Sequence, residues 1–247
     1  MEKFYDCKTD SQIKRDDFIK IYNGSYFLSG EKMVKGVIRN STVAENEIER
    51  ILNEGIKTDK DVINILAWKL GKIKHIETDD DKSGNIIFSK DWKNAYKLDI
   101  LRYGRQWENI KEFVDYIVRN INDLRSKSKC CPQKVLNELK DQAPKGIGTV
   151  YLITLLYFIS QGKYPIYDRF AYIALQGIKH GTEPFTKKIK PPILPDKNSE
   201  KFKSVYEDYI EPYVKELSDI FGSDYNRSVE EYRNIDRALW VYGHAFK

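Results

Sequence analysis

Two features of the sequence place residues that can bind or activate a ligand at informative positions. The first is the turn Pro144-Lys145-Gly146-Ile147-Gly148, which joins a short amphipathic stretch to a strongly apolar one. Glycines allow the backbone angles of a tight turn and leave amide N–H groups uncovered at the start of the following helix. Those amides, the Lys145 ammonium and the positive end of the helix dipole suit a phosphate group. We therefore expect an anion site from Lys145 to Thr149, against the alternative of an ordinary helical connection.

The second feature is Asp168, which lies twenty positions after Gly148 and precedes a predicted helix, Arg169 to Gln176. As an N-cap, its carboxylate would accept hydrogen bonds from amides of the first helical turn. A carboxylate at the mouth of a cleft can also stabilise positive charge that develops on a substrate. The two roles are compatible, so the position alone does not separate a structural aspartate from a catalytic one.

The secondary structure that holds the hairpin and Asp168 in place is predicted to be helical. Thr58 and Asp61 mark one helix start, and Ser228 and Glu231 have the spacing of a capping box at another. Apolar residues recur at helical spacing in four stretches: Ile63, Leu66, Ala67 and Leu70; Phe113, Ile117, Ile121 and Leu124; Val135, Leu136 and Leu139 after Pro132; and Tyr232, Ile235, Leu239 and Tyr242. We therefore expect an all-α fold, in which only residues 86–88 could add a minor short strand.

These helices are expected to form a single two-lobed domain that spans residues 1–247. We expect residues 134–160 to be two helices joined by the hairpin at 144–148, inside a lobe of about 131–180. The other lobe would take about 1–130 together with 200–247. The segment 181–199 holds four prolines and four lysines, which is typical of a solvated connection, with a DNA-backbone-binding arm as the alternative.

Composition excludes several classes of protein. Hydrophobic residues make up 41% and charged residues 32% of the chain, which excludes a disordered polyelectrolyte. The longest apolar run, residues 150–159, is half of the roughly 20 residues that a membrane span needs, and no signal-peptide core is present. Three cysteines and three histidines argue against a disulfide framework and a structural zinc site. We expect a cytoplasmic protein without cofactor or membrane partner, whose net charge of +5 permits a polyanionic partner.

With its turn and its aspartate, the stretch Leu139 to Leu175 resembles the helix-hairpin-helix DNA glycosylases. This superfamily includes endonuclease III and the adenine-mismatch, 8-oxoguanine and alkyladenine glycosylases. Members carry a hairpin of the form Leu-Pro-Gly-Val-Gly, then a buried helix, then a catalytic aspartate that in endonuclease III lies twenty residues beyond the last glycine. The resemblance implies a two-lobed, monomeric protein that binds double-stranded DNA, flips out a damaged or mismatched base and hydrolyses its N-glycosidic bond in base excision repair.

The resemblance also implies a role for individual residues. Asp168 would be catalytic. DNA would be contacted by Arg169 and by the hairpin residues Lys145, Gly146, Ile147, Gly148 and Thr149, whose carbonyls would hold a monovalent cation. Tyr151 and Tyr167 flank the motif and are base-pocket candidates among the 17 tyrosines of the chain. Arg169 could equally balance the charge of a neighbouring side chain.

The sequence departs from the superfamily at two informative places. Val150 stands where the members that also cleave the backbone carry a lysine, so no Schiff base can form there and a monofunctional glycosylase is expected. Asp168-Arg169-Phe170 replaces the usual Asp-Thr-His, and the cluster cysteines of endonuclease III are absent. These differences leave open a non-catalytic protein that binds duplex DNA through the hairpin, and a helical interaction protein without a nucleic-acid role.

Overall fold

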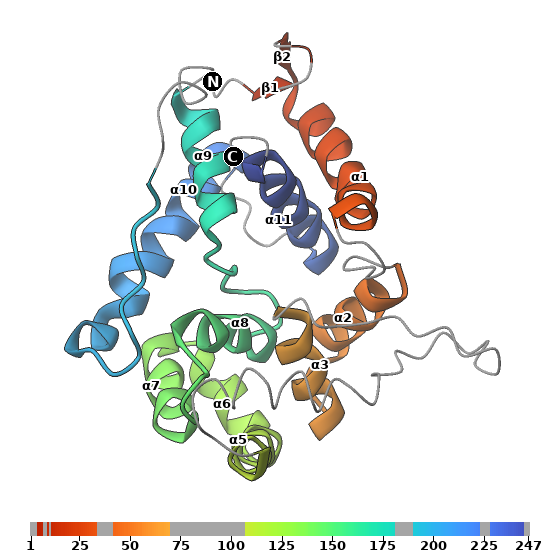
Figure 1. Ribbon diagram of the computed structural model, residues 1–247. Coiled ribbons are helices and arrows are strands. Elements are labelled where there is room, and N and C mark those ends of the chain that lie inside the picture. Colours follow the sequence, from red (N-terminus) through yellow and green to blue (C-terminus); the bar gives the residue numbers. More distant parts are fainter. Residues whose placement is uncertain are drawn as a thin grey trace, which may run out of the picture.

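A computed structural model describes residues 4–6, 9, 11–33, 42–69, 107–180, 190–222 and 228–244, and they are mostly helical (Figure 1). The α-helices are α1 (Arg15–Met33), α2 (Thr42–Glu54), α3 (Asp59–Lys69), α5 (Trp107–Arg119), α6 (Ile121–Ser128), α7 (Pro132–Gln142), α8 (Thr149–Ile159), α9 (Arg169–His180), α10 (Glu211–Phe221) and α11 (Val229–His244). A 3₁₀ turn, η2 (Glu200–Ser204), and a π-helical turn, η3 (Tyr206–Ile210), precede α10. The expected all-α character is confirmed.

A small antiparallel sheet lies near the N-terminus, formed by β1 (Phe4–Asp6) and β2 (Ser11–Ile13), with Phe4 opposite Ile13. Phe4 is buried, and its ring centroid lies 5.2 Å from that of Phe18 in α1. Strands of three residues are too short to show alternation, which is why the sequence pattern does not predict this sheet. The short strand expected at residues 86–88 lies outside the described residues.

The predicted helix starts at Thr58 and Ser228 are confirmed by reciprocal capping bonds. Asp61 N–H donates to Thr58 Oγ1 at 3.3 Å, and Thr58 N–H donates to Asp61 Oδ2 at 2.9 Å. Ser228 and Glu231 repeat this arrangement before α11, at 2.9 and 3.3 Å. Each pair satisfies two amides that helix geometry leaves unpaired, so the local sequence defines both starts.

The helices gather in two groups (Figure 1). In one group α8 is central and packs against α3, α6 and α7; in the other, α11 packs against α1 and α9, and α10 packs against α9. Nine of the 11 residues of α8 are buried, which makes it the core helix of its group. This grouping differs from the expected lobes, because α5 and α6 pack with the hairpin helices while α9 packs with the C-terminal ones.

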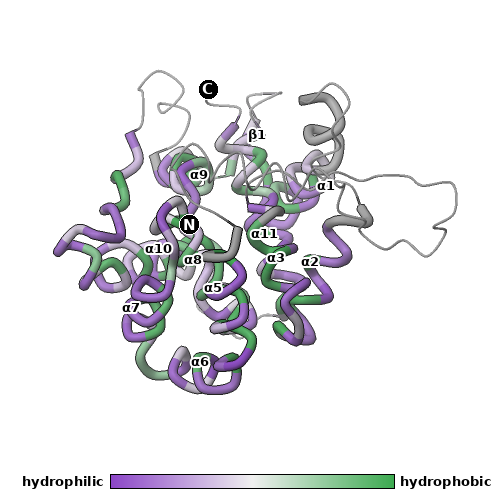
Figure 2. The backbone as a smooth tube through the Cα atoms, turned by 60° about the horizontal axis from the view of Figure 1, so that its bottom comes forward, coloured by the Kyte–Doolittle hydropathy of each residue, from purple (hydrophilic) through white to green (hydrophobic). Residues whose placement is uncertain are grey.

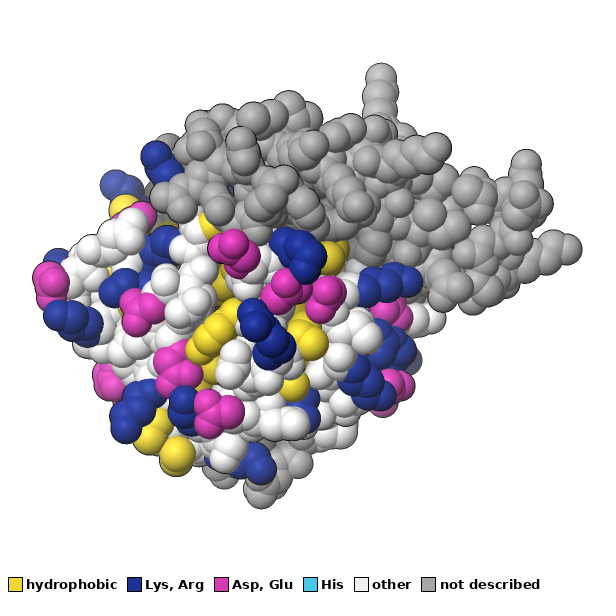
Figure 3. Space-filling view, turned by 90° about the horizontal axis from the view of Figure 1, so that it is seen from below, with side chains coloured by type: hydrophobic (Ala, Val, Ile, Leu, Met, Phe, Trp, Pro, Cys, Tyr) yellow, Lys and Arg dark blue, Asp and Glu magenta, His cyan; other side chains and the backbone are white. Residues whose placement is uncertain are grey.

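The surface and core patterns agree with this packing. Figure 2 shows green and purple residues alternating along α5, α6 and α7, as expected for helices with one buried face. On the face formed by the lower helices of Figure 1, Lys and Arg are interspersed with Asp and Glu (Figure 3). The described part of that face therefore carries no field of a single sign that would attract DNA.

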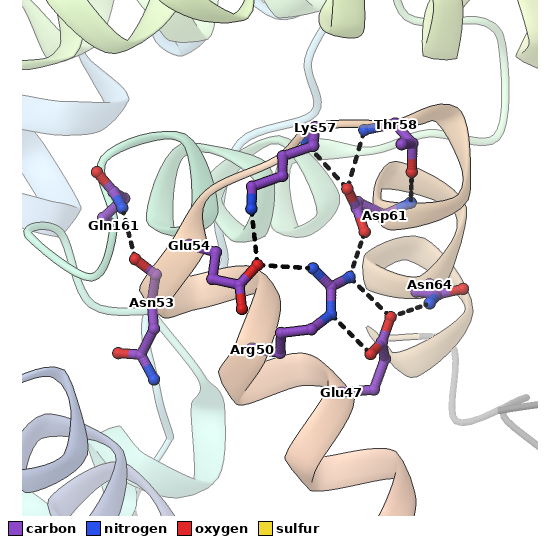
Figure 4. A network of polar contacts seen from close by, with 9 residues as sticks. All are labelled: Glu47, Arg50, Asn53, Glu54, Lys57, Thr58, Asp61, Asn64 and Gln161. Atoms are coloured by element: carbon purple, nitrogen blue, oxygen red, sulfur yellow. Dashed lines mark hydrogen bonds and ion pairs between the residues drawn. The ribbon is translucent and has the colours of Figure 1, made fainter. Parts of the chain in front are cut away.

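A polar network holds α3 against α2 (Figure 4). Arg50 in α2 donates to Asp61 Oδ1 at 2.6 Å, and the Asp61 side chain is only 4% exposed. Gln161, in the turn after α8, donates to the carbonyl of Asn53 at the end of α2, at 3.0 Å. These bonds tie α2, α3 and the turn after α8 together, and they thereby position Lys69, the last residue of α3.

Candidate nucleic-acid and catalytic site

The hairpin has the geometry that the sequence predicts. α7 ends at Gln142 and α8 begins at Thr149, so the two helices and their short connection are confirmed. Gly146 has a φ of 98°, in the left-handed region that side chains with a Cβ rarely adopt. Ile147 N–H donates to the Pro144 carbonyl at 3.2 Å and closes the turn. The turn itself therefore requires the glycine at position 146.

Gly148 serves a different purpose from Gly146. Its φ of −94° and ψ of −178° are ordinary extended values, and a Cβ built on it would have nothing within 4 Å. Protein packing therefore does not require glycine here. Helix geometry leaves the first amides of α8 without intrahelical partners, and Gly148 provides no side chain to cap them. Gly148 thereby leaves open space beside the start of α8.

The other hairpin residues divide into exposed and anchored positions. Lys145 is exposed beside Gly146, whereas Ile147 is 5% exposed and packs into the core. The Thr149 hydroxyl donates to the Pro195 carbonyl at 2.5 Å, in a residue that is 6% exposed. The Thr149 side chain therefore already has a partner inside the protein. Lys145 is the charged group of the turn that stands free to meet a phosphate.

A second lysine lies against the inner side of the hairpin. Lys197 is 7% exposed, and its Nζ donates to the carbonyls of Ala143 at 2.5 Å and Pro144 at 2.8 Å. The expectation that segment 181–199 is a solvated connection is therefore wrong for Lys197. Residues 181–189 of that segment lie outside the described residues. Hairpin carbonyls do meet a positive charge, and the charge belongs to a side chain of this protein.

Asp168 has two contacts. Its Oδ1 accepts a hydrogen bond from Phe170 N–H at 2.8 Å, which confirms the predicted N-cap of α9. Its Oδ2 lies 3.4 Å from Nζ of Lys69, and the two side chains are 21% and 15% exposed. The pair joins α9, of one group of helices, to α3, of the other. Sequence reasoning found Asp168 but missed Lys69, because 99 positions separate the partners.

Behind this pair lies a buried ionic cluster centred on Glu45, which is 1% exposed. One carboxylate oxygen of Glu45 accepts from Arg233 Nη2 at 2.8 Å and from Arg237 Nη2 at 2.9 Å. The other accepts from Trp68 Nε1 and Tyr26 Oη, both at 3.0 Å. Burial alone would raise the pKa of Glu45, but the two arginines hold it at about 2. The cluster therefore stays charged and ties α2 to α11.

Asp236 connects the buried cluster to Asp168. It forms an ion pair with Arg233, and its side chain is 23% exposed. Burial raises the pKa of Asp236, Arg233 opposes that shift, and the nearby negative charge of Asp168 raises the pKa further. The two carboxyl groups thus lie in different surroundings: Asp168 lies beside an amine, whereas Asp236 lies beside a guanidinium and has a raised pKa. Carboxyl groups in different surroundings can take different roles in one reaction.

A small apolar cavity adjoins Asp236. Its lining includes Pro165, Tyr213, Tyr232 and Leu239, and its volume is about 20 Å³. A volume of this size admits a single water, so this cavity does not accommodate a nucleobase. A flipped base would therefore need a different place among the residues around Asp168.

The two base-pocket candidates from the sequence differ in exposure. Tyr167 is 5% exposed, and its ring packs edge-on against Tyr213, with centroids 5.3 Å apart. Its ring faces other side chains of the protein, which leaves no room for a base in this structure. Tyr151 is half-buried on α8 and packs against the core. Only Tyr151 keeps partial exposure, and its role as a base contact stays a prediction.

Three half-buried rings beside Asp168 were not indicated by the sequence. Phe170 and His244 stack with centroids 3.5 Å apart, and Trp240 lies 3.9 Å from His244. The exposed Arg169 covers the Phe170 ring, with its guanidinium carbon 4.5 Å from the ring centroid. Arg169 thus packs on an aromatic ring in this structure. Stacking between α9 and α11 could not be foreseen, because aromatic residues are frequent along the whole chain.

Within the described ranges, no helix has the length and apolarity to cross a bilayer, and no group of three or more His, Cys, Asp or Glu side chains could hold a metal ion. The candidate residues lie at two places in the fold: the hairpin at 144–148, and the Asp168–Lys69 pair with the nearby carboxyl group of Asp236. Comparisons with protein-family models, curated proteins and solved structures found no match for this chain.

Proposed function

We propose that the protein binds duplex DNA through the hairpin at 144–148 and uses Asp168 to excise a damaged or mismatched base. Two observations carry this proposal: the open turn at Gly148, and the carboxylate of Asp168, which is held in place at the junction of α3 and α9. The turn offers amides and Lys145 to a phosphate, which is the sequence-independent part of DNA recognition. The carboxylate supplies a negative charge, which stabilises the positive charge that develops on the sugar when an N-glycosidic bond is hydrolysed.

The proposed reaction is hydrolysis of the N-glycosidic bond of one nucleotide. A base inside a duplex is inaccessible, so the nucleotide rotates out of the stack. As the bond between sugar and base breaks, positive charge develops on the sugar, and the Asp168 carboxylate stabilises it and orients the attacking water. The attacking water gives up a proton and the departing base takes one, and Asp236, whose pKa is raised by burial, can relay it. The products are a free base and an intact strand with an abasic site.

The second candidate function is binding to duplex DNA without catalysis, and one observation favours it. Asp168 already has a complete structural role, because it caps α9 through Phe170 and pairs with Lys69. A binding protein would keep the aspartate for these contacts alone. In that case the exposed turn would be the only part of the site that meets DNA.

Two measurements test these proposals. The purified protein is incubated with duplexes that each carry one damaged or mismatched base, and released base is measured by cleavage of the abasic strand with alkali. Binding is followed by fluorescence anisotropy over a range of salt concentrations. Release from at least one duplex supports the glycosylase, whereas binding to all duplexes without release supports the non-catalytic protein. Absence of binding in every duplex and at low salt would refute both.

The Lys145→Ala variant tests the hairpin in the same binding assay. Because Lys145 would meet phosphate, its loss should weaken binding to all sequences alike and reduce the slope of log affinity against log salt by about 0.9. Lys203→Ala is the matched control, since the Lys203 side chain is 68% exposed and lies in η2. An unchanged affinity and salt slope for Lys145→Ala would reduce the hairpin to a structural turn.

A further inference from the structure

The buried ammonium of Lys197 is unusual because it contacts the main chain of the hairpin. Its Nζ donates to two successive carbonyls, those of Ala143 and Pro144, at 2.5 and 2.8 Å. These carbonyls belong to the residues that leave α7 and enter the turn. The ammonium thus lies at the place where the direction of the turn is decided.

Neighbouring bonds fix the lysine in this position. Asn198 N–H donates to Asp196 Oδ1 at 2.8 Å, and Ser199 N–H donates to the Asp196 carbonyl at 2.9 Å, which makes a tight turn around Lys197. Two residues before the lysine, Pro195 accepts the Thr149 hydroxyl at 2.5 Å. The same short loop therefore contacts both ends of the hairpin, before the turn through Lys197 and after it through Thr149.

Electrostatics explains how the contact between Lys197 and the two carbonyls stabilises the turn. Burial of an ammonium group is costly unless strong acceptors surround it, so Lys197 and the two carbonyls depend on each other. The carbonyl of Pro144 also accepts Ile147 N–H, the bond that closes the turn. A positive charge at this carbonyl therefore stabilises the closed turn, and it adds to the positive potential at the start of α8.

We propose that Lys197 is a built-in cation that holds the hairpin in the shape required for contact with DNA, so that binding needs no dissolved metal cation. The proposal rests on the proposed binding of DNA by the hairpin. If Lys197 has this role, its truncation leaves a cavity lined by two carbonyl oxygens. A small monovalent cation can fill that cavity. Lys197 is a positioning residue, and the group that it positions is the turn at 144–148.

The test compares the parent protein with Lys197→Ala and Lys197→Met in K⁺ and in tetramethylammonium at equal ionic strength. The probe is a duplex with one abasic-site analogue, and the readout is anisotropy. The parent protein should bind equally in both salts. Lys197→Ala should bind roughly tenfold more weakly in tetramethylammonium, which is too large for the cavity, and should regain most of that affinity in K⁺. Lys197→Met should bind weakly in both salts, because its side chain fills the cavity without charge.

Two outcomes of the binding measurement would overturn the proposal. One is a parent protein that itself loses affinity when K⁺ is replaced, and the other is a Lys197→Met variant that binds as tightly as the parent. Lys203→Ala is the control for loss of a lysine near this loop. Melting curves separate this test from that of DNA binding: K⁺ should raise the melting temperature of Lys197→Ala and leave that of the parent unchanged, whether or not the protein binds DNA. Equal melting of Lys197→Ala in the two salts would also count against the proposal.

Discussion

The substitution Asp168→Asn separates the structural role of this residue from the catalytic one. Asparagine keeps an oxygen that can accept Phe170 N–H, so the cap of α9 is largely retained. The variant loses the charge that pairs with Lys69, in a contact where the side chains are 21% and 15% exposed. Exposed pairs contribute up to about 1 kcal/mol, and breaking a fully buried pair costs about 3–5 kcal/mol. For this partly shielded pair we expect a loss of about 1–2 kcal/mol in the free energy of unfolding.

A loss of this size cannot by itself abolish activity. Proteins of this size have unfolding free energies of about 5–15 kcal/mol, so the Asn variant remains folded. If Asp168 stabilises the sugar cation, its neutralisation should lower the rate of base release by about 10²–10⁴-fold while DNA binding persists. The two expectations differ enough in magnitude that one variant decides between them.

The assay follows base release on the duplex that the parent protein processes, together with anisotropy and thermal melting of each variant. Asp141→Asn is the matched control, because the Asp141 side chain is 67% exposed near the end of α7. Base release by Asp168→Asn at the parent rate would refute the catalytic role and leave the helix cap as the full explanation. A melting temperature far below that of Asp141→Asn would show instead that the ion pair with Lys69 is essential for folding.

Four further predictions rest on the backbone angles, the residue at position 150 and the ion pairs of Glu45. Gly148→Ala should change the unfolding free energy by less than about 0.5 kcal/mol because a Cβ there meets nothing within 4 Å, yet it should weaken duplex binding. Gly146→Ala should cost about 1–2 kcal/mol at its φ of 98°, and equal melting of the two variants would contradict these backbone angles. Borohydride should trap no adduct on an abasic duplex because Val150 carries no amine; an adduct mapped to Lys69 by mass spectrometry would reverse this prediction. The pKa of Glu45 falls from 4.5 to about 2 on folding, so its ion pairs stabilise the protein fully above pH 4.5 and are lost as the pH falls toward 2. Over that range the parent should lose about 3 kcal/mol more than Glu45→Gln in chemical denaturation.

Local features of the fold could be predicted from the sequence because their causes lie within a few residues. The caps at Thr58 and Ser228 require partners only three positions away. The hairpin could be predicted from two glycines between an amphipathic and an apolar stretch. The N-cap role of Asp168 could be predicted because a helix begins with the next residue. In each case backbone geometry and hydrogen-bonding capacity of neighbouring residues were sufficient.

Long-range contacts could not be predicted, because side-chain type alone does not select a distant partner. The pair of Arg233 with Glu45 spans 188 positions. Lys197 looked like one of four solvated lysines in a proline-rich loop, since its carbonyl partners lie 53 and 54 positions earlier. The packing of α5 and α6 with the hairpin helices, and of α9 with α11, likewise depends on contacts between distant parts of the sequence.

The segment that carries the motif does not carry the whole site. Residues 131–180 contain the hairpin and Asp168, but the charge against the hairpin carbonyls comes from Lys197 and the partner of Asp168 is Lys69. Lys69 is placed by α2 and α3 through the Arg50 network, and the buried pairs of Glu45 hold α2 to α11, the helix that supplies Asp236. The arrangement of the site therefore depends on contacts made along most of the chain. A short motif can indicate where a reactive aspartate lies, whereas its charge partners are determined by the complete fold.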